Sequence, residues 1–387
     1  MQRDVNLDHF ARRYAHCKRK GKSKLLDELC DLYGYNRKYL LQVFNHLTGK
    51  KYERRGAKRR YGGNDLLEPL KRIWQAADQM CSKRLKVAIE LWMPSYEDSF
   101  GVLPEEVKRD LLAISPASID RLLKAHKVHY KRHGLSGTKP GYLLKNHIPI
   151  KTDHWDVTQP GFMEADTVAH CGNSLSGEFV WSITLTDIKT CWTEIRATWC
   201  KGESGVLEQI REVEKTLPFK LLGFDCDNGS EFLNWHLVRY FTEDRVKAVT
   251  MTRSRPYRKN DNAHVEQKNW THVRQLFGYN RLDDYRVVRL MNDRYQNEWS
   301  LYQNHFMSTQ KLLTKEKINS KYRRRHERAK TPYQRILESP HIDDKIKMEM
   351  AILHQKLNPF TIKNMIEKKL KNIFRYVGRN QKPRTKL

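Results

Sequence analysis

FMEADTVAH at residues 162–170, FVWSITLTD at 179–187 and WTEIRATW at 192–199 are three short runs rich in β-branched, aromatic and alternating apolar residues. Glycines punctuate the segment between the first two runs. Runs of this kind, separated by turn residues, predict three consecutive strands that form a meander. After them, residues 206–217 repeat apolar side chains at helical spacing, and a buried strand is expected at 221–226.

Two aspartates occupy unusual positions in these predicted strands. Asp166 lies in the middle of the first strand, where a carboxylate is a poor strand former without a compensating contact. Asp227 ends the fourth strand, just before Asn228 and Gly229, at the edge of an α/β sheet where sites usually gather. Meander, helix, strand and helix is the order of the α/β ribonuclease-H-like fold, in which these aspartates would meet across neighbouring strands. Asp225 shares a strand face with Asp227 and is the alternative if the register differs.

Three windows of sequence carry a family resemblance. They are EADT at 164–167, DNGSEF at 227–232, and SRPY at 254–257 leading on to Glu266. Intervals of 61 residues from Asp166 to Asp227 and 39 residues from Asp227 to Glu266 separate their acidic residues. In this order the windows resemble the integrase-type DDE transposases of bacterial insertion sequences, which have a retroviral integrase-like catalytic core. The resemblance is clear over about residues 100 to 295.

The resemblance implies that Asp166, Asp227 and Glu266 are the catalytic residues and the metal ligands. By the same resemblance Asp166 bridges two Mg²⁺ ions, for which Mn²⁺ can substitute, and each of the other two completes one ion's shell. The chemistry suits these residue types, because two hard cations about 4 Å apart can stabilise the attacking and leaving oxygens of a phosphoryl transfer. Three carboxylates converging without cations would repel one another.

Basic residues around Glu266 are expected to contact DNA. Lys268 and Arg274 follow it on the same predicted helix, and Arg258 and Lys259 lie in the loop before that helix, where a plain solvated loop is an equal alternative. Members of the family commonly carry a basic residue seven positions after the glutamate, whereas this chain has Val273 there and Arg274 next. His170 and His264 flank the acidic residues and are candidates for proton transfer or for packing.

The overall charge supports a polyanionic partner. The chain has 73 Lys and Arg against 45 Asp and Glu, a formal net charge of +28, and an excess of this size repels itself unless a polyanion lies against it. Charge alone leaves a ribosome-associated or membrane-surface protein open. No run approaches the roughly 18 apolar residues that span a bilayer, so we expect a cytoplasmic, nucleoid-associated protein with no membrane partner. The seven cysteines form no CxxC pair, which argues against a zinc knuckle.

The rest of the chain is expected to be mainly helical and basic. Gly34 and Asn36 separate two helical patterns between residues 23 and 48, which outlines a helix-turn-helix or an ordinary helical hairpin. Pro94 is expected to close a helical stretch, and Ser115 to cap a later helix. The DNA-binding residues expected in these units are Arg37, Lys38, Gln42 and Arg121.

Six segments are predicted along the chain. They are a helix-turn-helix DNA-binding unit at 1–48, a basic linker at 49–64, a second helical or helix-turn-helix DNA-binding unit at 65–130, a linker at 131–160, the integrase-like catalytic core at 161–295 and a basic helical region at 296–387.

The resemblance thus implies a DNA transposase that uses Mg²⁺ to cleave transposon ends and to join their 3′-hydroxyls to target DNA. Its partners would be double-stranded transposon-end and target DNA, bound by a homo-oligomer on paired ends. Two alternatives remain at this point. One is a DNA-binding regulator derived from such an enzyme, with idle carboxylates, and the other is a ribonuclease-H-like nuclease that cuts without joining.

Overall fold

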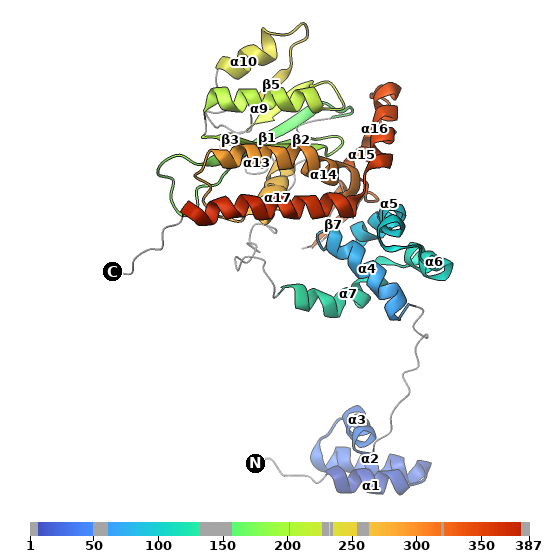
Figure 1. Cartoon of the computed structure of the whole chain (residues 1–387). Coiled ribbons are helices and arrows are strands. Elements are labelled where there is room, and N and C mark those ends of the chain that lie inside the picture. Colours follow the sequence, from blue (N-terminus) through green and yellow to red (C-terminus); the bar gives the residue numbers. More distant parts are fainter. Residues whose placement is uncertain are drawn as a thin grey trace. The chain divides into compact units, whose positions relative to one another are not determined.

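The computed structural model describes residues 7–48, 61–131, 157–200, 202–226, 232, 235–253, 263–318 and 321–380 (Figure 1). The chain divides into two compact units, Met1–Arg60 and Tyr61–Leu387. Asp227, Arg258, Lys259 and the predicted cap at Asn260 and Asp261 lie outside the described residues, as does almost all of the two predicted linkers.

The first unit is a bundle of three helices, α1 (Leu7–His16), α2 (Arg19–Tyr33) and α3 (Arg37–Leu47). Gly34 ends α2 in the left-handed conformation, with φ of 69°, and the side chain of Asn36 caps α3 by accepting from the Lys38 N–H at 2.9 Å. The two predicted helices around Gly34 are therefore confirmed. Helix α1, which the sequence analysis missed, adds Ala11 to a small core that includes Leu26 and Phe44.

The second unit is built on a five-stranded mixed sheet in the order β3-β2-β1-β4-β5. Strands β1, β2 and β3 form an antiparallel meander, and β4 and β5 continue the sheet parallel to β1. The bounds are β1 (Phe162–Ala169), β2 (Val180–Asp187), β3 (Thr193–Trp199), β4 (Gly223–Cys226) and β5 (Thr250–Arg253). This order and these directions are those of the ribonuclease-H-like fold, and the four predicted strands are confirmed to within two residues.

Helices cover both faces of this sheet (Figure 1). One face packs Ala165 and Leu185 against α9 (Glu203–Thr216) and α10 (Trp235–Thr242). The other face packs Val168 and Ile195 against helices that follow β5. These helices are α11 (Ala263–Lys268), η1 (Asn269–Arg274), α12 (Gln275–Phe277), α13 (Arg286–Arg294), η2 (Tyr295–Trp299) and α14 (Ser300–Phe306).

The helices before the sheet share a hydrophobic core with the sheet and with the end of the chain. They are α4 (Asn64–Ala76), α5 (Ser82–Phe100), α6 (Glu105–Ala113) and α7 (Pro116–Lys131). Trp92 of α5 is fully buried, donates from Nε1 to the Phe306 carbonyl at 3.2 Å, and meets the Phe360 ring edge-on at 5.2 Å. The expectation that Pro94 closes the helix is wrong, since Pro94 lies inside α5, where tertiary packing outweighs its local cost. Ser115 accepts from the Ser118 N–H, as predicted for a cap.

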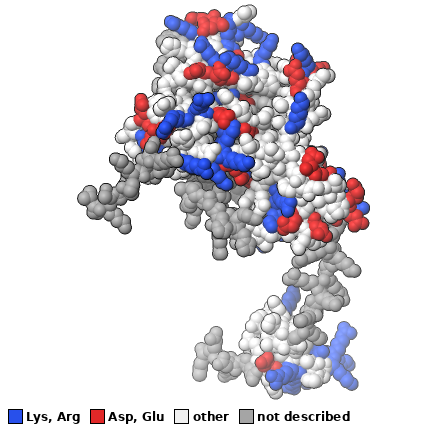
Figure 2. Space-filling view, viewed as in Figure 1, with Lys and Arg blue, Asp and Glu red and all other residues white. Residues whose placement is uncertain are grey.

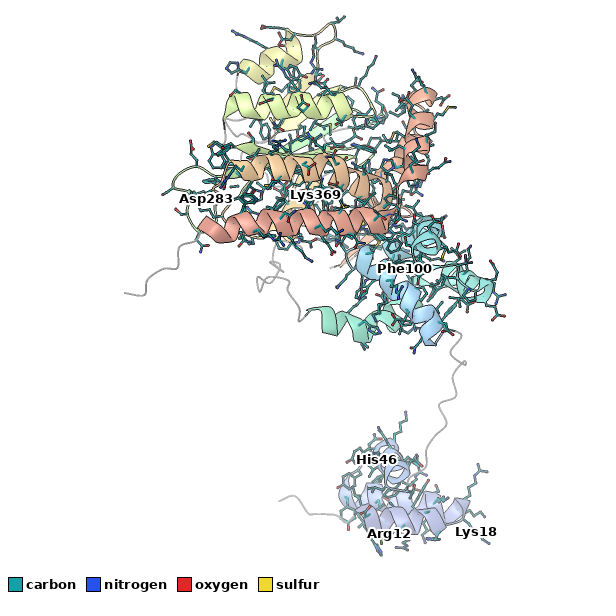
Figure 3. The ribbon with its side chains drawn as sticks, in the orientation of Figure 1. Arg12, Lys18, His46, Phe100, Asp283 and Lys369 are labelled. Carbon is teal, nitrogen blue, oxygen red and sulfur yellow. The ribbon has the colours of Figure 1, made fainter. Side chains whose placement is uncertain are left out.

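The end of the chain contains three helices and one hairpin. The helices are α15 (Pro332–Glu338), α16 (Asp344–Lys356) and α17 (Pro359–Asn380). Lys369 of α17, labelled in Figure 3, pairs with Asp293 and Glu298. The strands are β6 (Leu312–Ile318) and β7 (Lys321–His326), which pair antiparallel. The prediction of a mainly helical region missed this hairpin because it buries neither face, so no alternation of apolar residues marks it.

Candidate functional site

Asp166 lies in the middle of β1, the central strand of the sheet, opposite Thr184 of β2. Its side chain is half-buried. One carboxylate oxygen, Oδ1, accepts from the Thr167 N–H at 2.7 Å, and the other, Oδ2, accepts from the Asn269 side-chain amide at 2.7 Å. Hydrogen bonds of this kind stabilise the ionised carboxylate and fix its rotamer, so the structure supplies the compensating contact that a mid-strand Asp requires.

A second carboxylate of β1 binds the start of the helix that carries Glu266. Glu164, on the same strand face as Asp166, is 2% exposed and accepts from the Val265 N–H at 3.0 Å. This N–H belongs to the first turn of α11, where backbone donors lack intrahelical partners and a carboxylate is favourable. Together the contacts from Glu164 and Asp166 dock α11 and the first residue of η1 onto β1.

Glu266 occupies the first turn of α11 and its side chain is exposed. Asn269 follows it by three residues, a spacing that places two side chains on one face of a helix. Because Asn269 reaches Asp166, the helix of Glu266 lies against the strand of Asp166. The structure therefore brings together the two elements from which the sequence predicted a shared site, and it adds Asn269, which the sequence analysis did not single out.

The strand before Asp227 borders the same site. Cys226, its chain neighbour and the last residue of β4, pairs with Ala165, the residue before Asp166. Asp225, the alternative to Asp227, pairs with Glu164, is 5% exposed, and accepts from the Thr252 hydroxyl at 2.6 Å. Within the described residues, which exclude Asp227, no three His, Cys, Asp or Glu side chains lie close enough together to hold a metal ion.

Lys268 points into the protein rather than toward the surface. Its side chain is 8% exposed, and burial, with the positive charges of Arg84 and Arg335, lowers its pKa to about 8. The predicted phosphate contact does not fit this position, because a DNA backbone cannot reach a buried ammonium group. The sequence predicts that this helix has an outer basic face, but a π-helical turn begins at the next residue and alters which side chains face outward.

The π-helical segment η1 changes the spacing after Glu266. An α-helix returns to the same face after about seven residues, whereas a π turn, with i→i+5 hydrogen bonds, inserts one extra residue. Val273, seven positions after Glu266, is fully buried. Arg274, eight positions after it, is half-buried, lies 4.7 Å from the centre of the Tyr279 ring and has its pKa lowered by burial. The π turn thus moves Arg274 toward the place that residue 273 would have in a regular α-helix.

His170 serves packing rather than proton transfer. It is fully buried at the end of β1, bonds Ser182 Oγ through Nε2 at 2.8 Å, and meets the Phe277 ring edge-on. Burial, with the nearby charge of Arg274, lowers the pKa of His170 to about 3, so the ring stays neutral at physiological pH. The side chain of His264, the other flanking histidine, is outside the described set.

The predicted DNA-binding residues of the helical units are exposed. Arg37 pairs with Asp27 and donates to Ser23 at 2.8 Å, while Lys38 and Gln42 point outward on α3. Figure 3 shows that this three-helix unit also presents Arg12, Lys18 and His46. In the second unit Arg121 is exposed on α7 and donates to the Ser118 hydroxyl at 2.9 Å.

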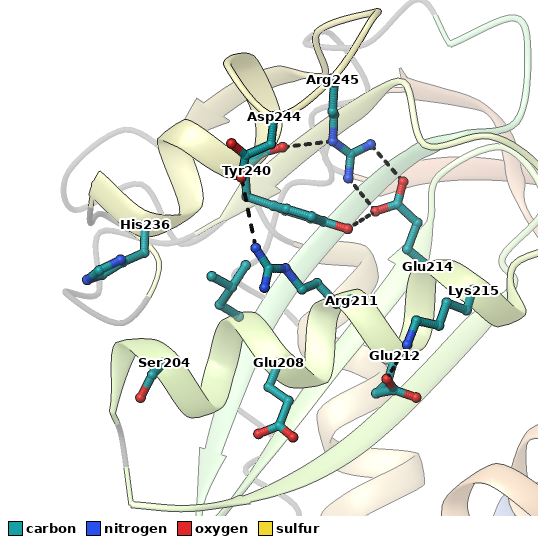
Figure 4. A pocket seen from close by; sticks show the side chains of 11 residues that line it. Ser204, Glu208, Arg211, Glu212, Glu214, Lys215, His236, Tyr240, Asp244 and Arg245 are labelled. Atoms are coloured by element: carbon teal, nitrogen blue, oxygen red, sulfur yellow. Dashed lines mark hydrogen bonds and ion pairs between the residues drawn. The ribbon is translucent and has the colours of Figure 1, made fainter.

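A separate cavity of about 600 Å³ lies between α9 and α10, on the sheet face opposite α11 (Figure 4). Glu214 accepts hydrogen bonds here from Arg245 and from the Tyr240 hydroxyl. Burial by itself raises the pKa of Glu214, but these hydrogen bonds outweigh it, so the pKa lies below its ordinary value. Burial and the bond to Glu214 raise the pKa of Tyr240 to about 12. This cluster joins two helices, and its carboxylate, Glu214, is taken up by Arg245 and Tyr240.

Arg245→Met should lower the free energy of unfolding by about 1–3 kcal/mol at pH 7, because a charge-assisted hydrogen-bond pair is lost. Glu214 has a folded-state pKa below its unfolded value of about 4.3, so its stabilisation is present above that pH and is lost as the pH falls through the folded pKa. Urea unfolding at several pH values should show the gap between the wild type and the variant closing below about pH 4. A gap that stays constant with pH would contradict this assignment.

A central strand bearing Asp166, with the helix of Glu266 docked on it in a sheet of order β3-β2-β1-β4-β5, defines a protein of the ribonuclease-H-like class. The chain belongs to the family of the uncharacterized protein y4rM of Sinorhizobium fredii. The two are 35% identical over 327 residues, which cover 83% of this chain and 91% of that relative. No model of a known protein family matches the sequence.

Two solved structures show weak likeness. The catalytic core domain of BIV integrase has a TM-score of 0.27 and 16% identity, covering 47% of this chain and 96% of that one. The simian T-cell lymphotropic virus intasome in complex with PP2A regulatory subunit B56 gamma has a TM-score of 0.33 and 16% identity. The match covers 62% of this chain and 73% of that chain. These scores are low, and the strand order, not these likenesses, identifies the fold. In the part of the chain that the structure describes, no helix combines the length and the apolar character needed to cross a bilayer.

Proposed function

We propose that this protein is a DNA transposase of the integrase type, which cleaves DNA at transposon ends and joins the exposed 3′-hydroxyl to target DNA. One observation carries the proposal above all others. Asp166 stands at the centre of the sheet and holds, through Asn269, the helix on which Glu266 is exposed. A carboxylate placed mid-strand and held in one orientation by a dedicated amide is preorganised in the way that a metal or catalytic site requires.

The residues at this place fit divalent cations of the Mg²⁺ type. Asp166, Asp227 and Glu266 would hold two such ions, since carboxylate oxygens are the ligands that hard cations prefer. When bound, the ions stabilise the attacking and leaving oxygens of an in-line displacement at phosphorus. Mn²⁺ would substitute, having the same preference for oxygen ligands.

The chain's own residues have separate tasks in this proposal. Asn269 holds the Asp166 carboxylate in one rotamer, and Glu164 fixes the start of the helix that presents Glu266. Arg274, with Arg258 and Lys259 from the preceding loop, would contact phosphates near the cleaved bond. Lys268, being buried, has no part in binding DNA.

Sequence recognition is assigned to the exposed basic residues of the helical units. Arg37, Lys38 and Gln42 lie on α3, the helix that follows the turn at Gly34, and in a helix-turn-helix the helix after the turn is the recognition helix. Arg121 lies on α7 after another short helix. Two such DNA-binding helices in each chain would let a homo-oligomer hold paired transposon ends. The net charge of +28 favours double-stranded DNA as the partner.

The test uses labelled duplexes taken from both sides of the coding sequence, incubated with the full chain and Mg²⁺ and with a plasmid as target. Cleavage followed by covalent joining to the plasmid is the expected result. Cutting without joining would identify a nuclease of the same fold. Binding with neither reaction would identify a regulator derived from a transposase.

Asn269→Ala should lower the rate of cleavage by roughly 10- to 100-fold, the equivalent of one hydrogen bond to a charged group. Losing that bond also removes a stabiliser of the ionised Asp166, so the acidic limb of the pH–rate profile should move to higher pH. Gln267→Ala, at an exposed position of the same helix, is the matched control and should leave both quantities unchanged. A reduced rate with an unmoved pH profile would show that Asn269 serves folding alone.

A further inference from the structure

The β6–β7 hairpin, which we call the basic ribbon, concentrates positive charge in a short stretch of the second unit. Residues 311–330 contain nine Lys and Arg and only two Glu. The described side chains of β7 are all exposed, as are most of those in β6. By contrast, the face of this unit seen in Figure 2 mixes Lys and Arg with Asp and Glu. The ribbon is therefore a local concentration of positive charge rather than a sample of the general surface.

The base of the ribbon is fixed to the body of the unit. Arg335 of α15 is 8% exposed and pairs with Glu327, just after β7. Lys311, just before β6, donates to the carbonyls of Ile188 at 2.9 Å and Lys189 at 3.0 Å in the turn after β2. Thr309 and Lys330 close the base with a further β-bridge. The two strands thus project from an anchored root and are not a loose loop.

The two faces of the ribbon differ in charge. Directly opposite residues share a face, and the pairs Lys315–Arg324 and Lys317–Tyr322 lie on one of them. This face has three cations, no carboxylate and an aromatic ring, with the Lys315 ammonium 4.8 Å from the centre of the Tyr322 ring. The opposite face carries Arg323 and Arg325 and also a carboxylate, Glu316, directly across from Arg323. We call the first of these the cationic face.

The cationic face is unfavourable for the hairpin on its own. Like charges directly opposite each other destabilise a strand pair, and an isolated two-stranded hairpin is only marginally stable in water. Lys315 and Arg324 are such a pair. A polyanion against this face would remove the repulsion, so the ribbon is complementary to a line of phosphates.

We propose that the basic ribbon enters the major groove of double-stranded DNA with its cationic face toward the phosphates, an inference that rests on the proposed function for its choice of DNA as partner. The major groove is about 12 Å wide and admits a two-stranded β-ribbon. The seven residues of β6 extend for about 23 Å at about 3.3 Å per residue, enough to follow several phosphates. Glu316 favours the orientation, because its carboxylate lowers the net positive charge of the face that carries Arg323 and Arg325.

The root of the ribbon lies close to the candidate site. Lys311, at the root, donates to the Ile188 carbonyl at 2.9 Å, and the Ile188 N–H donates to the Phe162 carbonyl at 2.9 Å. Phe162 is the first residue of β1, the strand that carries Asp166. DNA held by the ribbon would therefore lie on the same part of the molecule as the carboxylates, which gives the ribbon a role in placing the duplex.

Two double variants of the full chain test the proposal. Lys317→Gln with Arg324→Gln removes two charges from the cationic face, and Arg323→Gln with Arg325→Gln removes two charges from the opposite face. Binding of a fluorescent duplex of arbitrary sequence is measured by anisotropy in EDTA at several KCl concentrations. The first variant should bind the duplex at least about 10-fold more weakly than the wild type. The slope of the logarithm of its binding constant against the logarithm of the KCl concentration should be shallower by about 2, the value for two lost phosphate contacts. The second should change both quantities much less.

Equal effects of the two variants, or no effect of either, would overturn the proposal. So would a change of oligomeric state in sedimentation with unchanged DNA affinity, which would identify the partner as a second copy of this chain. Thermal unfolding of both variants should match the wild type, since the four residues are exposed. Catalysis is absent in EDTA, so binding through the ribbon without later cutting in Mg²⁺ would count against the proposed function alone.

Discussion

Asp166→Asn is expected to abolish metal-dependent cleavage and joining while leaving DNA affinity near that of the wild type. The substitution keeps the size of the side chain and its polar oxygen but removes the negative charge that a divalent cation requires. Metal stabilisation of a phosphoryl-transfer transition state is worth several kcal/mol, so the rate should fall by about 10³-fold or more. Strand transfer of labelled end DNA measures the rate, and calorimetric titration with Mn²⁺ measures the loss of cation binding.

Asp225→Asn is the matched control for this experiment. Asp225 lies on the neighbouring strand, on the same face of the sheet, but its carboxylate is committed to the Thr252 hydroxyl. Its substitution should cost stability more than catalysis. If Asp225→Asn abolished cleavage and Asp166→Asn did not, the catalytic carboxylate would have to be assigned to β4 instead of β1.

Much of the sheet could be predicted because its strands obey simple rules. The meander of β1, β2 and β3 follows the alternation and β-branched content of its residues, and β4 follows a short buried run. The hairpin of β6 and β7 obeys neither rule. Arg323, Arg324 and Arg325 follow one another there, and three consecutive cations show neither the alternation of a strand nor the spacing of a helix. Only cross-strand pairing, which is a long-range property, makes this segment a ribbon.

The local geometry around Glu266 was beyond prediction for a different reason. The position of Arg274 depends on a π-helical turn that packs against β1, and residues 269–274 carry no sequence signature for such a turn. The burial of Lys268 likewise depends on long-range packing. Asn269 offered one weak signal, an amide three residues after a candidate metal ligand, on the same helix face. The role of Asp227 stays a prediction.

Domain boundaries were the least predictable feature, because a boundary depends on contacts between distant residues. The sequence predicted separate units at 65–130, 161–295 and 296–387. In the structure Trp74, Val273 and Ile366 belong to one hydrophobic cluster, although each comes from a different predicted unit. The pattern of an amphipathic helix predicts that one face is buried, but it does not predict which other element covers that face.

Trp92→Ala should lower the free energy of unfolding of the second unit by about 3–5 kcal/mol, as expected for removing a fully buried aromatic side chain. The ring contacts Tyr302, Phe306 and Phe360 at centroid distances of 6.2, 6.2 and 5.2 Å, so the loss is shared by α5, α14 and α17. Tyr285→Ala, at a position that is 69% exposed, should cost much less. Calorimetry of the full chain gives both values.

The same experiment decides whether the helices before the sheet form a domain of their own. A shared core makes α4 to α7, the sheet and α17 unfold together, because removing one contact weakens the whole cooperative unit. Trp92→Ala should then shift a single transition that includes the loss of β-sheet signal in circular dichroism. If the helices formed an independent domain, that domain would unfold at a lowered temperature, while the unfolding temperature of the sheet would not change. In the first case DNA bound by Arg121 on α7 and the carboxylate on β1 act on one rigid support, which lets recognition and chemistry keep a fixed separation.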